Sequence, residues 1–310
     1  LLCNLYPYRI KLIMKLVFDI YKLYLMHHLK IFIELTRLNK PIGFMLLFWP
    51  CSWGLAYAYI VNNDFNLFTY YLILFFLGSV LMRSAGCIFN DIVDKNYDKK
   101  VNRTKKRPLA AGIITIKQSF AYVLMLCLIA FFILIQFNLL TIVLGMGSML
   151  LAFVYPFMKR ITYWPQLFLG ITFNWGIIMA WAAINNSITI EISILYISAI
   201  FWTLGYDTIY GAQDMSDDEI IGLKSTSIKF KNNLWLFVAV SYLISIILIV
   251  YLFNNYYGNN LFSFFSVMFV LSLLYQLFYL RGRKSNNYLN LFKFNNYTGL
   301  FLFLGICSIN

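Results

Sequence analysis

The chain contains few charged residues and almost no histidine for its length. Only 12% of its 310 residues are charged, and only 12 are acidic. Its two histidines, His27 and His28, are adjacent near the start, which excludes a histidine metal centre or a Ser-His-Asp triad in the body of the chain. The five cysteines are scattered and show no metal or redox spacing.

Apolar residues are what the chain has in excess. They make up 61% of the sequence, and the mean hydropathy is +0.73. Soluble domains are roughly 45–50% apolar, because a water-soluble chain needs a polar exterior. The composition therefore excludes a soluble enzyme, a disordered protein and a secreted disulfide scaffold. It predicts a polytopic membrane protein.

Runs of about 20 mostly apolar residues mark membrane-spanning helices. The sequence predicts an all-α membrane bundle of nine such spans, at 42–61, 67–89, 118–136, 139–158, 164–184, 190–211, 234–253, 261–280 and 290–310. The ninth is the weakest, because Lys293, Asn295 and Asn296 lie in its first half.

The chain has a net charge of +13, and between the predicted spans its basic residues lie in alternate connections. Connections after the second, fourth, sixth and eighth spans carry Lys and Arg, the last of them Arg281, Arg283 and Lys284, whereas the other connections carry none. Positive loops stay in the cytoplasm, so we expect a cytoplasmic N-terminus. Because the charge sets topology in this way, we expect the lipid bilayer and no nucleic acid as a partner.

Residues 1–30 form a basic extension before the predicted bundle of 31–310. We expect either an amphipathic helix on an anionic membrane surface or, since the chain begins with Leu, residues that precede a natural start at Met14 or Met26. The first 40 residues are rich in Lys and contain no Ser, unlike a mitochondrial transit peptide. We therefore expect a bacterial inner membrane in preference to a mitochondrial one.

Most of the acidic residues gather at the cytoplasmic ends of the second and sixth predicted spans. These eight residues are Asp91, Asp94, Asp98, Asp207, Asp214, Asp217, Asp218 and Glu219. In the first segment, Asn90, Asp94 and Asp98 are four residues apart, so a helix would place all three on one face.

In the second segment, Asp207, Asp214 and Asp218 are separated by seven and four residues, which predicts another helical stripe. Carboxylates on one stripe repel each other, and bound divalent cations relieve that repulsion. Oxygen ligands without His or Cys favour Mg²⁺, which prefers one or two carboxylates together with substrate phosphates. Two such segments therefore predict a diphosphate held through Mg²⁺.

Basic residues follow both acidic segments. Arg103 and Arg107 lie just after the first and Lys224 just after the second. A guanidinium suits phosphate recognition well, so we expect all three residues to contact the diphosphate.

Residues 90–112, NDIVDKNYDKKVNRTKKRPLAAG, resemble the signature of the UbiA family of intramembrane aromatic prenyltransferases. Residues 206–225, YDTIYGAQDMSDDEIIGLKS, resemble the second acidic motif of that family. The stretches RLNKPIGFMLLFWP (37–50) and YPFMKRITYWPQLFLG (155–170) resemble its 4-hydroxybenzoate polyprenyltransferase branch. The resemblance extends from about residue 30 to residue 310.

The resemblance implies a Mg²⁺-dependent transfer of a polyprenyl group from polyprenyl diphosphate to the ring carbon ortho to the hydroxyl of 4-hydroxybenzoate, in ubiquinone biosynthesis. The implied metal ligands are Asn90, Asp94, Asp98, Asp214 and Asp218, of which the four aspartates are catalytic. Water exclusion would protect the allylic cation. Two alternatives stay open, namely another acceptor within the same superfamily and a transporter that uses the acids as a cation site.

Four further residues have two interpretations each. Lys159 and Arg160 either hold the carboxylate of 4-hydroxybenzoate or anchor a loop. Asp207 either binds the aromatic substrate or pairs with a nearby base. Arg83 lies in an apolar span, so it is either functional or paired. The chain length of the polyprenyl group and the oligomeric state are not predicted.

Overall fold

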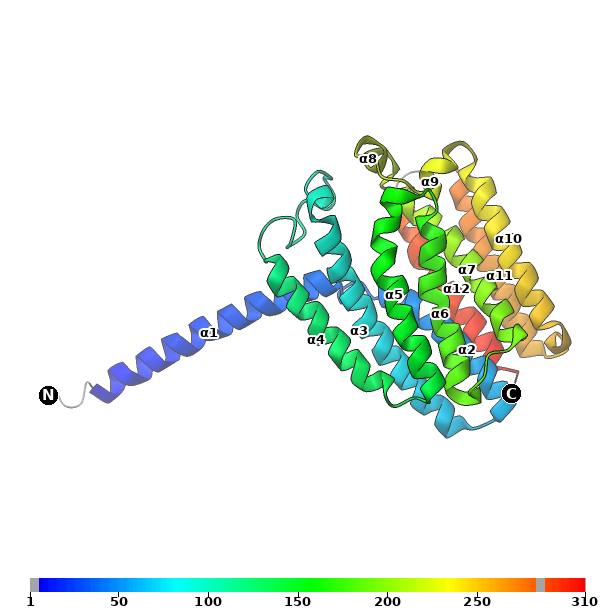
Figure 1. The fold of residues 1–310 in the computed structure, drawn as a ribbon, viewed down its shortest axis with the longest axis horizontal. Helices are drawn as coiled ribbons and strands as arrows, with labels where there is room; N and C mark the ends of the chain where they lie inside the picture. The colour runs from blue at the N-terminus through cyan, green and yellow to red at the C-terminus, as the bar shows by residue number, and fades with distance from the viewer. Residues whose placement is uncertain (1–5, 283–287, 310) are drawn as a thin grey trace.

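The computed structural model describes residues 6–282 and 288–309, and every regular element in this part of the chain is helical (Figure 1). The long helices are α1 (Tyr6–Thr36), α2 (Ile42–Asn62), α3 (Phe65–Asp98), α4 (Ile116–Leu134), α5 (Leu139–Ile161), α6 (Pro165–Asn185), α7 (Ile190–Gly211), α10 (Leu234–Leu252), α11 (Asn260–Arg281) and α12 (Tyr288–Cys307). Two short helices, α8 (Met215–Ile220) and α9 (Thr226–Lys229), follow α7. The predicted all-α class is confirmed.

Eight helices of the described chain are long and apolar enough to cross a membrane: α2 to α7, α10 and α11. The chain is therefore a multi-pass membrane protein. The expected ninth span coincides with α12, which has the length of a span but lies outside these eight. Its role as a span stays a prediction. Arg283 and Lys284, two of the basic residues expected after the eighth span, lie outside the described residues.

The polar residues of α12 are used inside the bundle. Asn295 is completely buried, and its side-chain oxygen accepts hydrogen bonds from Trp202 Nε1 of α7 (2.9 Å) and from Gln276 Nε2 of α11 (3.2 Å). Its amide nitrogen donates to Gln276 Oε1 (2.9 Å). Asn295, which lowers the hydropathy of α12, thus links this helix to α7 and α11.

Helix α3 extends well beyond the predicted span 67–89. It begins at an N-cap in which Asp64 accepts a hydrogen bond from the Leu67 amide (3.0 Å), and it continues without interruption to Asp98. The first acidic motif therefore lies on the last turns of a membrane helix, as the four-residue spacing predicted.

The second acidic motif is not one continuous helix, so the predicted single stripe of Asp207, Asp214 and Asp218 is wrong. Helix α7 ends at Gly211, and the chain turns before α8 begins. The cause is α9, which folds back on the end of α7, where Ser227 Oγ donates to Thr208 O (2.8 Å). A Cβ atom on Gly211 would lie 2.6 Å from Ser227 Oγ, so this close packing depends on the glycine.

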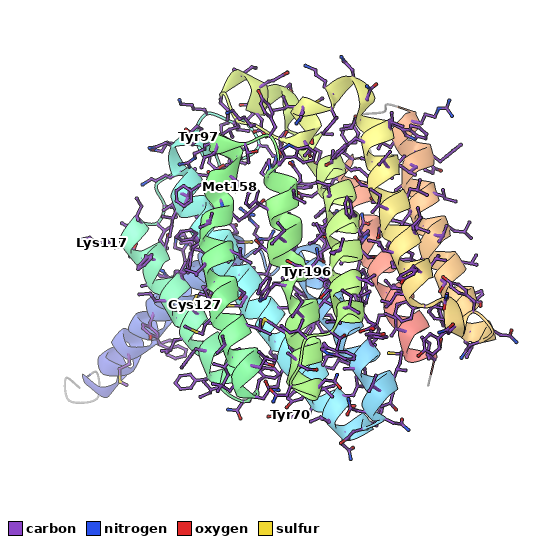
Figure 2. All side chains as sticks on the ribbon, turned by 45° about the vertical axis from the view of Figure 1, so that its right-hand side comes forward. Tyr70, Tyr97, Lys117, Cys127, Met158 and Tyr196 are labelled. Atoms are coloured by element: carbon purple, nitrogen blue, oxygen red, sulfur yellow. The ribbon has the colours of Figure 1, made fainter. Side chains whose placement is uncertain are left out.

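The connections that carry the two motifs lie at the same end of the bundle (Figure 1). Figure 2 shows Tyr97 at this end and Tyr70 at the opposite end. Helix α1 extends away from the bundle (Figure 1) and packs on it only near its last turns, where Ile31 and Leu35 join a buried cluster with Ile88 of α3. The membrane-surface role of the N-terminal extension stays a prediction.

We expect Asn295→Ala to lower the free energy of unfolding in detergent by about 1–3 kcal/mol, because it leaves the buried Trp202 and Gln276 groups without their partner. The matched control is Asn290→Ala, which removes an exposed asparagine from the same helix. Unfolding monitored by tryptophan fluorescence measures both. Equal effects of the two changes would contradict the structural role of this buried network.

Candidate active site

One large cavity, of about 1490 Å³, opens between the helices and contains both acidic motifs. Its polar lining includes all the expected site residues except Arg160: Asn90, Asp94, Asp98, Arg103, Arg107, Lys159, Asp207, Asp214, Asp218 and Lys224. Residues up to 134 positions apart in the sequence therefore face one space, which the sequence pattern alone did not establish.

Asp94 is the most deeply buried carboxylate of the first motif, with 1% of its surface exposed. Two cations at the end of α5 compensate its charge. Lys159 Nζ donates to Oδ2, and Arg160 Nη2 lies 3.2 Å from Oδ1. Arg160 also donates to Val93 O (2.9 Å) and places its guanidinium 4.9 Å from the centroid of the Tyr97 ring. Arg160 thus lies behind the cavity wall and binds α3 to α5.

Asp98 and Asp91 share a guanidinium. Arg107 Nη1 lies 2.8 Å from Asp98 Oδ2 and 3.1 Å from Asp91 Oδ1. Asp91 also accepts from Arg37 Nη2 (2.5 Å), which comes from the connection between α1 and α2. Sequence reasoning missed Arg37, because 54 positions separate it from its partner. The only sequence signal for Arg37 was its position in the stretch 37–50, which resembles the 4-hydroxybenzoate polyprenyltransferase branch.

Asp214 joins the two connections across the cavity end. Arg103 Nε donates to its Oδ1 (2.7 Å) and Arg103 Nη2 to its Oδ2 (2.5 Å), a bidentate ion pair. Asp218 lies nearby, and burial together with the Asp214 carboxylate raises the pKa of Asp218 to about 6. A cation bound beside Asp218 would favour its ionised form.

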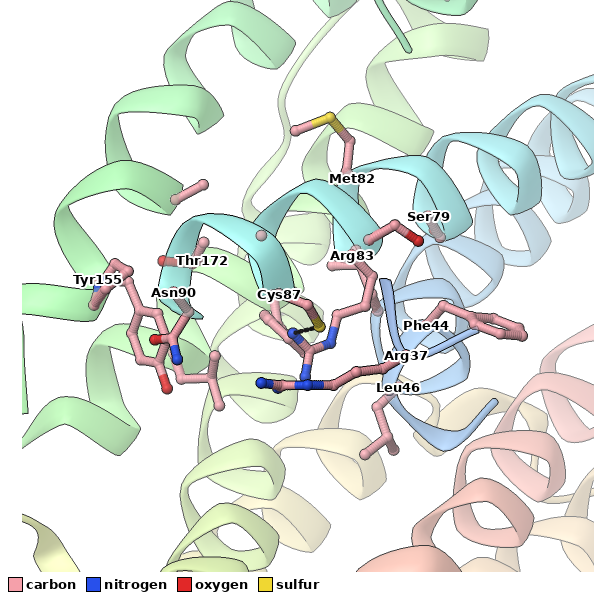
Figure 3. A pocket seen from close by; sticks show the side chains of 18 of the residues that line it. Arg37, Phe44, Leu46, Ser79, Met82, Arg83, Cys87, Asn90, Tyr155 and Thr172 are labelled. Atoms are coloured by element: carbon pink, nitrogen blue, oxygen red, sulfur yellow. Dashed lines mark hydrogen bonds between the residues drawn. The ribbon is translucent and has the colours of Figure 1, made fainter. Parts of the chain in front are cut away.

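The remaining expected residues are less engaged. Lys224 Nζ donates to Ile161 O (3.1 Å), so it lies beside the end of α5. Asp207, from α7, makes no side-chain hydrogen bond with the described residues. Figure 3 shows Arg83, Asn90 and Tyr155 around the same pocket, Arg83 lying deeper along α3 than Asn90.

The donor set fits Mg²⁺ only together with a diphosphate. Within residues 6–282 and 288–309, no three His, Cys, Asp or Glu side chains are close enough to form a metal cage by themselves. The two motifs instead offer separate carboxylate oxygens around one space. This arrangement matches an ion that takes one or two carboxylates and completes its coordination with phosphate oxygens and water.

The other part of the cavity is apolar. Leu124, Leu128 and Phe131 of α4 face it, as do Met146 and Met149 of α5. Flexible methionines and branched apolar side chains suit a long hydrocarbon ligand, because they fill irregular space without demanding hydrogen bonds. The cavity thus joins a strongly charged end to a wall fit for a hydrocarbon.

A family model, described as the UbiA prenyltransferase family, matches residues 47–298 of the chain. This match covers more than half of the sequence and includes both acidic motifs. The chain belongs to the UbiA prenyltransferase family. As a UbiA protein, it shares its fold with a UbiA homologue from Aeropyrum pernix K1 (TM-score 0.72, 22% identity, 84% of this chain and 96% of that one). A homologue from Archaeoglobus fulgidus bound to GPP and Mg²⁺ aligns with a TM-score of 0.68 at 17% identity, over 90% of this chain and 99% of that one.

Among curated UbiA relatives, a 4-hydroxybenzoate octaprenyltransferase from Vibrio atlanticus (strain LGP32) is 39% identical over 277 residues, covering 89% of this chain and 96% of the relative. Mitochondrial 4-hydroxybenzoate polyprenyltransferases of Arabidopsis thaliana and Homo sapiens are 46% and 49% identical, over 69% and 65% of this chain. This chain spans about half the length of those two, 53% and 54%.

We expect Arg103→Gln to speed amide hydrogen exchange about fivefold in 99–115 and 212–222, because the bidentate pair with Asp214 links these segments. The half-exposed pair is worth about 1 kcal/mol after solvent screening. Lys105→Gln is the control, since that ammonium donates to Asn102 within its own connection. Exchange mass spectrometry measures both, and unchanged exchange in Arg103→Gln would contradict the link.

Proposed function

We propose that this chain transfers a polyprenyl group from polyprenyl diphosphate to the ring carbon ortho to the hydroxyl of 4-hydroxybenzoate, in ubiquinone biosynthesis and with Mg²⁺. One observation carries the proposal: a single cavity has acids and cations of two separate motifs at one end and an apolar wall beyond them. A prenyl diphosphate has the same division into a charged head and a hydrocarbon tail.

The acceptor is proposed from the relatives. Curated relatives that are 39–49% identical to this chain are named for 4-hydroxybenzoate. Another acceptor within the family has no comparable support, and neither has transport, since the acids lie at helix ends beside basic connections. The structures of more distant homologues support the fold only.

The proposed diphosphate site works by exchange of ion partners. Bound Mg²⁺ would supply positive charge that stabilises the leaving diphosphate. The ligands would be Asn90, Asp94, Asp98, Asp214 and Asp218. When these carboxylates turn to the cation, Lys159 would lose Asp94 and Arg103 would lose Asp214, so both would become free to donate to phosphate oxygens, with Lys224 beside them. Arg107 would lose Asp98 and keep Asp91, and its other N–H groups could donate to the phosphate. The electron pair of the breaking C–O bond leaves with the diphosphate, and the allylic carbon becomes electrophilic.

The proposed acceptor site lies deeper. Arg83 faces the cavity seven residues before Asn90, about 10 Å along the helix axis, which leaves room for one aromatic ring between them. Its Nε is buried without a hydrogen-bond partner among the described residues, and Nη1 has only Cys87 Sγ at 3.0 Å. We therefore assign the benzoate carboxylate to Arg83, because Lys159 is proposed for the diphosphate and Arg160 does not line the cavity. Asp207 would face the same ring from α7.

The apolar wall of α4 and α5 would hold the prenyl tail and keep bulk water from the allylic cation.

For the compartment, we propose the inner membrane of a bacterium with the N-terminus in the cytoplasm. Relatives from bacteria and from mitochondria both match the chain, so fractionation of the source cell distinguishes the two membranes.

We expect membranes that contain the chain to convert labelled 4-hydroxybenzoate and a polyprenyl diphosphate into a lipid-soluble product with Mg²⁺ and not with EDTA. Asp94→Asn and Asp214→Asn should each lower the rate at least a hundredfold, because each removes a metal ligand and leaves the packing intact. Glu219→Gln is the control, an exposed acid of the second motif that pairs with Lys231. A folded protein that makes no product would reject this acceptor.

We expect Arg83→Gln to raise KM for 4-hydroxybenzoate about ten- to a hundredfold with little change in KM for the prenyl diphosphate. Loss of a charge-assisted hydrogen bond of about 1.5–3 kcal/mol accounts for this range. Arg160→Gln tests the earlier interpretation in the same assay. If Arg160→Gln alone raises KM for 4-hydroxybenzoate, the carboxylate lies at the end of α5 and the assignment to Arg83 is wrong.

A further inference from the structure

Asp91 has no place in the proposed set of metal ligands, yet it is among the most buried charged groups of the described residues, with 2% of its surface exposed. It follows Asn90 directly on α3, so its side chain leaves the helix in a different direction from the stripe of the first motif. A buried carboxylate has lost its hydration, so it needs an opposite charge beside it. Removing one partner of such a pair leaves the other charge buried and unpaired.

Two guanidiniums provide that compensation, and both contact the same oxygen. Arg37 Nη2 lies 2.5 Å and Arg107 Nη1 3.1 Å from Asp91 Oδ1. The side chains of both arginines are more exposed than the carboxylate, at 24% and 21%, and both line the cavity. Asp91 also belongs to the cavity lining but is almost closed to solvent, whereas its two more exposed donors border the space where the diphosphate would bind.

Both arginines keep most of their hydrogen-bonding capacity. A guanidinium carries five N–H donors in a fixed plane, and Asp91 occupies one from each arginine. Arg107 Nη1 is also shared with Asp98 Oδ2 at 2.8 Å. If Asp98 turns to a cation, Asp91 still fixes Arg107. Arg37 and Arg107 would then face the single carboxylate of Asp91, which would leave this corner of the cavity positive.

Arg37 reaches this corner through an unusual backbone. Its φ is +57°, a left-handed conformation that residues other than glycine rarely adopt. It follows the last residue of α1 in the connection to α2, and its carbonyl accepts a hydrogen bond from the Lys40 amide at 2.9 Å. Such a conformation persists where surrounding contacts fix it, and the ion pair with Asp91 is a contact of that kind.

We propose that Asp91 is a positioning residue, a buried carboxylate that aims Arg37 and Arg107 at the diphosphate and does not ligate the metal. The inference rests on the proposed function. Both arginine contacts are made by Oδ1, so two cations already lie against this carboxylate, which disfavours a metal ion as a third. A purely structural residue would not need donors that border the cavity.

The test is binding of geranyl S-thiolodiphosphate, a poorly ionising analogue, to the purified full chain with Mg²⁺, by calorimetry. We expect Asp91→Asn to weaken binding about tenfold, since the amide keeps the shape but loses the charge. Asp91→Glu should recover part of the loss. In the double variant with Arg37→Gln, the loss should be smaller than the product of the two single losses, because both act through one contact.

Three comparisons separate this role from others. At saturating analogue, the half-saturating Mg²⁺ concentration should stay within about twofold for Asp91→Asn and rise more than tenfold for Asp94→Asn. KM for 4-hydroxybenzoate should not change. Asp64→Asn, which removes a carboxylate from the other end of α3, is the matched control and should bind the analogue normally.

Unchanged analogue affinity in Asp91→Asn, or a rise in its Mg²⁺ requirement like that of Asp94→Asn, would overturn the positioning role. So would a loss of thermal stability with equal losses for both substrates. If the unaltered protein does not bind the analogue with Mg²⁺, the proposed function itself fails. Failure of the positioning role alone gives a different result: the unaltered protein and the Asp91 variant then both bind the analogue normally.

Discussion

The compensation of buried carboxylates constrains this structure more than any other interaction. A carboxylate within a bilayer costs roughly 3 kcal/mol on insertion scales, so it requires a partner or water. Asp91, Asp94 and Asp98 meet this requirement with cations from other elements. The same pairs attach α3 to α5 and to the connection before α2. The acids therefore organise one end of the bundle even before any ligand binds.

This internal compensation also explains how one site can serve both a metal and an anion. On the proposed function, each carboxylate that turned to a cation would release a lysine or arginine contact, and the released N–H groups could donate to a phosphate. Binding of the metal alone, or of the diphosphate alone, would leave the charges of the site unbalanced. On the proposed function, metal and diphosphate would thus favour each other's binding, which suits Mg²⁺ because that ion binds weakly to one or two carboxylates.

The sequence allowed the helical class, most spans and the helical first motif to be predicted, because hydropathy and four-residue spacing are local properties of a helix. It failed where long-range packing decides. The predicted single stripe of the second motif is interrupted, because α7 ends at Gly211, where α9 packs against it. The buried hydrogen bonds that Asn295 makes with other helices were not predicted either. Spacing could not predict which cation meets which acid either, since Arg103 and Asp214 are 111 residues apart.

The cations of the cavity therefore fall into two kinds. Those near the motifs are paired with aspartates and can exchange partners, whereas Arg83 has a buried donor without an acceptor among the described residues. A buried donor without an acceptor favours binding of a ligand that supplies a charged oxygen. A ligand without such an oxygen binds more weakly, because the buried donor then stays unpaired. Diphosphate recognition by exchange and acceptor recognition by an unmet donor can thus operate in one cavity, since the two sets of cations are separated along α3.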